Sequence, residues 1–170
     1  MIYAFIVAAF VYRFTMLAVS IRNEKVLRAG GGIERGPTNS SLLAIAHIAF
    51  YVAGSVEGIV RGPGFDAVTG IGLAIYLFGA AMLFVVSRLL GRLWTVKLLI
   101  ARDHELVTHP LFRAGRHPNY YLNILPELMG YALTLHAIVT LIVGIAIYLV
   151  PPAMRIRLEE RVMRDTFARY

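Results

Sequence analysis

The sequence predicts an all-α protein, a polytopic helical bundle in a membrane, from its composition, its long apolar segments and the placement of its charges. Of the 170 residues, 58% are hydrophobic and 16% are charged, against about half and about a quarter in soluble domains. The mean hydropathy is +0.68. A soluble domain of this length cannot bury so much apolar surface, whereas a bilayer accepts it. We therefore expect a single membrane domain, residues 1–170.

Three apolar segments precede residue 91, and each is near the roughly 20 residues that cross a bilayer. They are 1–21, 41–60 and 67–90. The first lacks the basic region and cleavage site of a signal peptide, so we expect it to remain as a span. Residues 22–40 contain a triple glycine and a Gly-Pro pair, which predicts a flexible loop. The three spans form a predicted N-terminal bundle, 1–90.

The remaining region, 91–170, contains one apolar stretch that is too long for a single span. Residues 119–150 are apolar for 32 positions, with polar Thr134 and His136 near the middle. We expect a helical hairpin with a turn near residues 134–137, which gives five transmembrane helices in all. The two prolines that follow would kink or restart the second helix.

Basic residues fix the expected orientation. Fifteen of the 17 Lys and Arg residues fall in 22–40, in 88–118 or in the tail from 151. Five spans place all of these on one side, which the positive-inside rule assigns to the cytosol. A single span over 119–150 would put the C-terminal arginines outside. The prediction is an N-terminus outside, a cytosolic C-terminus and residence in the cell inner (plasma) membrane.

The absence of cysteine and the basic charge exclude several function classes. There is no cysteine, which excludes disulfides, thiolate catalysis and cysteine-ligated metals. The net charge is +7, but the basic residues flank apolar segments. Lipid head groups and orientation explain that pattern, so we expect no nucleic-acid partner.

Three of the five histidines lie within the eighteen residues 104–121. Pro118 can open the following helix, whose free N–H groups favour an anionic ligand group. One alternative is a basic loop anchored to lipid head groups. Metal binding by His104, His109 and His117 is less favoured because their spacing matches no standard ligand pattern. No metal is therefore expected.

A second polar cluster begins at Arg155. Arg155 and Glu159 are four residues apart and share one face of a helix. In isolation this pattern is typical of a solvated helix at the membrane surface. The hairpin, however, returns the chain to the side it left, so residues 104–121 and 155–160 can meet there. Such a site suits a lipid-soluble substrate that meets a water-soluble cosubstrate.

Charged residues inside spans are expensive and are usually functional or paired. Arg13 and Glu127 each lie about eight residues from the predicted cytosolic ends of their spans. We expect a buried ion pair between them; the alternative is that Arg13 extends to the interface. Glu57 is expected to be interfacial, and His47 to be a packed polar residue. Small residues in the third span, such as Gly70, Gly72, Gly79 and Ala80, allow close helix contact.

Two sequence motifs carry a resemblance to a known family. The first is Arg116-His117-Pro118-Asn119-Tyr120, and the second comprises Pro151-Pro152 followed by Arg155-Ile156-Arg157-Leu158-Glu159-Glu160. They match R-H-P-x-Y and P-x-x-x-R-I-x-x-E-E in the isoprenylcysteine carboxyl methyltransferase family, which the chain resembles over residues 94–170. The first three spans match in hydropathy and in a basic loop.

The resemblance implies S-adenosylmethionine-dependent methyl transfer to a lipophilic substrate that enters from the bilayer. It assigns Arg155 and Glu159 to orient the reacting group. It assigns the following residues to the cofactor: His104, Leu106, Arg116, His117, Pro118, Tyr120, Tyr121 and Glu160. Arg155 suits a carboxylate or phenolate, because its planar guanidinium is permanently charged.

Several functions remain open at this point. The leading one is methylation of an oxygen, either carboxylate or phenol/enol hydroxyl, on a prenylcysteine or a long-chain polyketide. Methylation of a phospholipid amine would use the same mechanism. A sterol-type reductase that uses NADPH shares a similar C-terminal region but is much longer. A non-enzymatic channel or scaffold would have to explain why the polar residues gather at one face.

Overall fold

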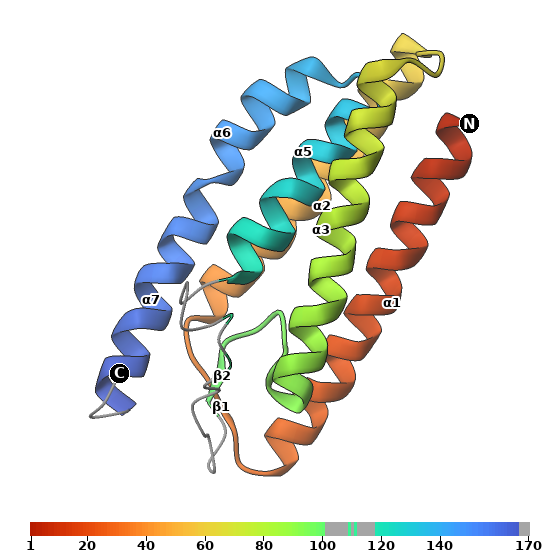
Figure 1. The fold of residues 1–170 in the computed structure, drawn as a ribbon. Coiled ribbons are helices and arrows are strands. Elements are labelled where there is room, and N and C mark those ends of the chain that lie inside the picture. Colours follow the sequence, from red (N-terminus) through yellow and green to blue (C-terminus); the bar gives the residue numbers. More distant parts are fainter. Residues whose placement is uncertain (101–108, 110, 112–117, 167–170) are drawn as a thin grey trace.

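The computed structural model describes residues 1–100, 109, 111 and 118–166, and it is helical almost throughout (Figure 1). The expected all-α class is therefore confirmed. The helices are α1 (Ile2–Ala29), α2 (Pro37–Arg61), α3 (Ala67–Leu90), α5 (Leu125–Thr134), α6 (Ile145–Tyr148) and α7 (Val150–Thr166), with a short 3₁₀ turn η1 (Gly91–Leu93) and π-helical segments η2 (Asn119–Ile124) and η3 (Thr140–Gly144). The N-terminus and the α2–α3 connection lie at one end, and the C-terminus at the other (Figure 1).

Four helices of the described residues are long and apolar enough to cross a membrane. They are Ile2–Ala29, Pro37–Arg61, Ala67–Leu93 and Thr140–Val162. The first arm of the predicted hairpin, Asn119–Thr134, is helical but is not among them. The structure thus gives four such spans where the sequence predicts five.

The predicted loop 22–40 is much shorter in the structure. α1 continues to Ala29, and α2 begins at Pro37 directly after Gly36, whose φ of 61° is left-handed. Strands β1 (Ile33–Glu34) and β2 (Leu99–Ile100) pair antiparallel. The charges at the end of α1 favour the helix rather than breaking it, because Arg28 and Glu24 pair four residues apart.

A turn follows Thr134, where the hairpin is expected to reverse. His136 has a φ of 52°, and its Nε2 lies 3.0 Å from Thr69 Oγ1 and 3.1 Å from Asp66 Oδ1. The Glu57 side chain caps the start of the second arm of the hairpin. Its carboxylate accepts hydrogen bonds from the backbone N–H groups of Val139 and Thr140. Glu57 is therefore more than the interfacial residue that the sequence suggests.

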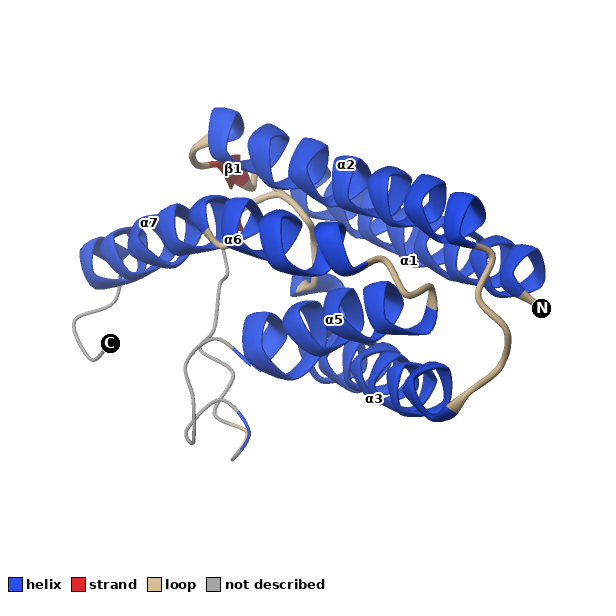
Figure 2. Cartoon of the chain, turned by 90° about the horizontal axis from the view of Figure 1, so that it is seen from above, coloured by secondary structure: helices blue, strands red, loops and turns tan. Residues whose placement is uncertain are grey.

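α5 packs closely along α3 (Figure 2). A Cβ atom on Gly72 would lie 2.4 Å from the Thr134 nitrogen, and one on Gly130 would lie 2.2 Å from the Tyr76 nitrogen. No larger residue fits without moving the backbone. Gly72 therefore allows close contact between two helices of the same chain. The sequence alone does not show whether such small residues pack within one chain or between two chains.

Candidate functional site

Arg155 is buried and held from three sides. It is 3% exposed. Its Nε donates to Glu159 Oε1 at 2.7 Å, its Nη1 to Ser40 Oγ at 2.8 Å and its Nη2 to the Val96 carbonyl at 3.2 Å. The predicted pairing of Arg155 and Glu159 is confirmed. Three elements position this guanidinium: α7, the first turn of α2 and the segment before β2.

Tyr120 joins the two predicted clusters. Its hydroxyl donates to Glu159 Oε1 at 3.0 Å, and the same oxygen accepts from Arg155. This contact brings the start of the hairpin to the helix that follows it. Within the described residues, the convergence that the sequence predicts is confirmed for these three side chains.

The π-helical segment η2 sets the direction of Tyr120. Pro126 has no N–H, and its ring excludes a normal hydrogen bond to the carbonyl of Leu122. The Leu125 N–H instead donates to the Tyr120 carbonyl, five residues back. Segments of this kind occur frequently at functional sites. Pro118, which precedes η2, is helical with a φ of −61°.

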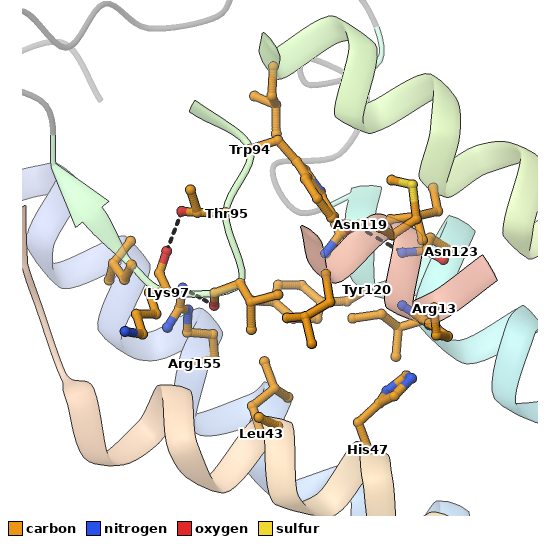
Figure 3. Close-up of a pocket in the computed structure, with 18 of the residues that line it drawn as sticks. Arg13, Leu43, His47, Trp94, Thr95, Lys97, Asn119, Tyr120, Asn123 and Arg155 are labelled. Atoms are coloured by element: carbon orange, nitrogen blue, oxygen red, sulfur yellow. Dashed lines mark hydrogen bonds between the residues drawn. The ribbon is translucent and has the colours of Figure 1, made fainter. Parts of the chain in front are cut away.

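A cavity of about 510 Å³ extends from this cluster into the apolar interior. Pro118, Tyr120, Arg155 and Glu159 line its polar end. The rest of its lining is largely apolar and includes buried Leu43 and Trp94 together with exposed Phe14 and Leu17. Figure 3 shows Tyr120 and Leu43 between Arg155 on one side and Arg13 and His47 on the other. A polar reaction centre thus opens onto space suited to a lipophilic molecule.

The other sequence-predicted site residues fall elsewhere. His104, Leu106, Arg116 and His117 lie outside the described residues. Tyr121 is 43% exposed and does not line the cavity. Glu160 is partly buried and also lies outside the cavity lining. In the described part of the chain, no group of three His, Asp or Glu side chains is arranged to hold a metal.

The inner end of the cavity contains the ion pair that the sequence predicts. Arg13 on α1 donates through Nε and Nη2 to the two carboxylate oxygens of Glu127 on α5. The Tyr51 hydroxyl donates to the same carboxylate. Glu127 is fully buried, whereas Arg13 is 21% exposed and lines the cavity. The bidentate pair locks α1 to α5, so the alternative in which Arg13 extends to the interface is excluded.

Sequence reasoning missed several residues of the site. Ser40 and the carbonyl of Val96 hold Arg155, yet neither belongs to a motif. His47 and Trp94 line the cavity. Helical spacing offers a weak signal for part of this set, because Ser40, Leu43 and His47 share one face of α2. Nothing in the sequence indicates that Val96 approaches that face, because it depends on the β1–β2 pairing.

Comparison with known proteins shows the family of the chain. A model of the isoprenylcysteine carboxyl methyltransferase family matches residues 71–165, more than half of the chain. An uncharacterized protein of Haemophilus influenzae is 47% identical over 155 residues, covering 91% of this chain and 90% of that protein. The uncharacterized protein YpbQ of Bacillus subtilis is 25% identical over 166 residues, covering 97% and 98%. No solved structure matches the chain.

Proposed function

Because the chain belongs to the isoprenylcysteine carboxyl methyltransferase family, we propose that it transfers the methyl group of S-adenosylmethionine to an oxygen of a lipophilic substrate. The acceptor is a carboxylate or a phenol or enol hydroxyl, on a molecule such as a prenylcysteine or a long-chain polyketide. The observation that carries the proposal is the cavity, which joins the Tyr120–Glu159–Arg155 cluster to an apolar interior.

The residues present fit a sulfonium cofactor at the polar end of the cavity. The Tyr120 ring and the Glu159 carboxylate both line that end, and a sulfonium cation is attracted by an aromatic face and by a negative charge. Pro118 shapes the same wall. When bound, the cofactor supplies an electrophilic methyl group, which an acceptor oxygen takes in line as the sulfur leaves as a thioether.

The residues of the chain contribute alignment and the exclusion of water. Arg155 is held by three bonds, so its guanidinium is pre-organised to orient an anionic acceptor oxygen. Glu159 fixes Arg155 and accepts the proton of a hydroxyl acceptor. The apolar walls keep water from the acceptor, which strengthens these interactions.

The first test is cofactor binding. Purified protein should bind S-adenosylmethionine or its demethylated product in a calorimetric titration, and His117→Ala should abolish binding. The matched control is His109→Ala, since His109 lies in the same segment but is exposed and outside the cavity lining. Binding of NADPH instead, or of neither compound, would contradict the proposal. Labelled methyl groups traced into an extracted lipid pool would then identify the acceptor.

The proposed site faces the cytosol of a five-span protein in the inner (plasma) membrane, with the N-terminus outside. The partners are membrane lipids and a substrate from the bilayer, with no nucleic acid. The distribution of basic residues supports this orientation.

The orientation can be tested with single cysteines, because the chain has no cysteine of its own. Gly30→Cys should react with a membrane-impermeant maleimide only after the cells are opened, and Gly64→Cys in intact spheroplasts. The reverse pattern would contradict the orientation.

A further inference from the structure

The inner end of the cavity presents polar groups that the ion pair leaves unused. Within the described residues, Arg13 Nη1 donates no hydrogen bond, although Nε and Nη2 are engaged. His47 Nδ1 lies 3.1 Å from the Tyr148 hydroxyl, while its Nε2 is buried and has no partner in the described part of the chain. Both side chains line the cavity. A buried polar nitrogen without a partner is costly unless a ligand or water satisfies it.

We infer that Arg13 and His47 form a second recognition point, which binds an uncharged oxygen on the lipophilic substrate. This inference rests on the proposed function for the identity of the other end of the substrate. Arg13 Nη1 donates to a carbonyl or hydroxyl oxygen. The His47 ring, whose Nε2 is enclosed in the structure, completes the contact when it turns toward that oxygen in the tautomer that the group requires. An anionic group is disfavoured there, because both carboxylate oxygens of Glu127 already pair with Arg13. At the other end Glu159 pairs with Arg155 through one oxygen, and a bound sulfonium would add a positive charge.

The two helices that line the cavity give the spacing between the two polar ends. Ser40, which holds Arg155, and His47 are seven residues apart on α2. Arg155 and Tyr148, which contacts His47, are also seven residues apart along α6 and α7. Seven residues of helix rise about 10 Å. Both walls of the cavity therefore give the same spacing between the two polar ends. We expect the second oxygen of the substrate to lie about 10 Å from the methyl acceptor.

The space between these ends is apolar on at least one wall. Leu43 lies between Ser40 and His47 on the cavity face of α2. The substrate class that fits is therefore a long-chain molecule with an acceptor oxygen at one end and one ketone or hydroxyl partway along the chain. A plain hydrocarbon tail would leave Arg13 Nη1 and His47 Nε2 unsatisfied.

The chain contains its own reporter for this site. Trp94 is the single tryptophan; it is 7% exposed and lines the cavity. Full-length protein in detergent can be titrated, by Trp94 fluorescence, with para-dodecylphenol and with two analogues. One analogue carries a ketone on the fifth chain carbon, near the spacing derived above, and the other carries it next to the terminal methyl.

The analogue with the ketone on the fifth carbon should bind about five- to tenfold more tightly than para-dodecylphenol, as expected for about one net hydrogen bond. The terminal ketone should give no such gain. His47→Phe should reduce the preference to less than about twofold, whereas the same change at exposed His109 should keep it. Because all proteins are measured in one detergent, probe partition cancels when the preference of a variant is compared with that of the wild type. The two ketones are positional isomers, so their partition is similar.

Equal binding of the two ketones by the wild-type protein would overturn the inference, and so would a preference that survives His47→Phe. The wild-type comparison decides the question even if that variant fails to fold. Calorimetry with S-adenosylmethionine on the same sample separates the two proposals. Cofactor binding without ketone preference refutes only the second recognition point. Ketone preference without cofactor binding refutes the proposed function and leaves the recognition point standing.

Discussion

Arg13→Met removes the cation from a bidentate pair that joins α1 to the first turn of α5. Glu127 is then left fully buried, and the Tyr51 hydroxyl still donates a hydrogen bond to its carboxylate. Two charge-assisted hydrogen bonds disappear, each contributing about 1.5–3 kcal/mol. Breaking a buried pair from one side typically costs about 3–5 kcal/mol, and we expect Arg13→Met to fall in that range.

The converse change should cost less. Glu127→Met leaves Arg13 with 21% of its side chain exposed to the cavity, where water can solvate it. We expect about 2–3 kcal/mol. The double variant has neither charge and keeps apolar volume, so it should be destabilised by about 1 kcal/mol at most. The coupling energy, which is the sum of the single costs minus the double cost, is then about 4 kcal/mol or more.

The assay is reversible unfolding in mixed detergent and SDS micelles, followed by the fluorescence of Trp94. Arg61→Met is the matched control, because Arg61 makes an exposed pair with Glu57, and such pairs contribute about 0.3–0.5 kcal/mol. A coupling energy below about 0.6 kcal/mol, the average for hydrogen bonds between membrane helices, would refute the assignment of this pair as the lock between α1 and α5.

Three further predictions concern packing, catalysis and pH. Gly130→Val places a Cβ 2.2 Å from the Tyr76 nitrogen and should lower the unfolding free energy by about 2 kcal/mol or more; an unchanged SDS midpoint would contradict the helix spacing. Arg155→Lys loses the planar fork and should lower kcat/KM for labelled methyl transfer about a hundredfold, whereas a loss below threefold would exclude the assigned role. The Thr69 backbone N–H lowers the pKa of Asp66, so Asp66 stabilises the fold above the usual carboxyl pKa of about 3.9 and that gain is lost as pH falls. The Tm deficit of Asp66→Ala should therefore be full at pH 7 and shrink as the pH falls below about 3.9, and a deficit that does not change with pH would refute it.

Depth and topology were sufficient to predict one long-range ion pair and the meeting of two polar clusters. Arg13 and Glu127 lie at similar depths, and a charge in hydrocarbon needs a partner, so pairing follows without knowledge of the fold. The contact of Tyr120 with Glu159 follows from the hairpin, which returns the chain to one side. In both cases the cost of an unpaired polar group leaves few alternatives.

Contacts made by the backbone could not be predicted in the same way. The carbonyl of Val96 binds Arg155 in a segment that is held by Ser20 and by the pairing of β1 with β2, and two-residue strands have no sequence signature. Glu57 looked interfacial because hydropathy reports depth but does not show that its carboxylate caps the second arm of the hairpin. The loop between the first two helices was overestimated because charged residues can extend an apolar helix beyond the bilayer.

The extra residue accommodated by η2 makes the motif at Tyr120 sensitive to insertion and deletion. Removing one residue from 121–124 would restore ordinary helical geometry and turn Tyr120 by about 100° relative to α5. The phenol would then point away from Glu159, although every motif residue would still be present. Among relatives of this chain, the number of residues between the motif tyrosine and the proline that follows it should therefore vary less than their identity.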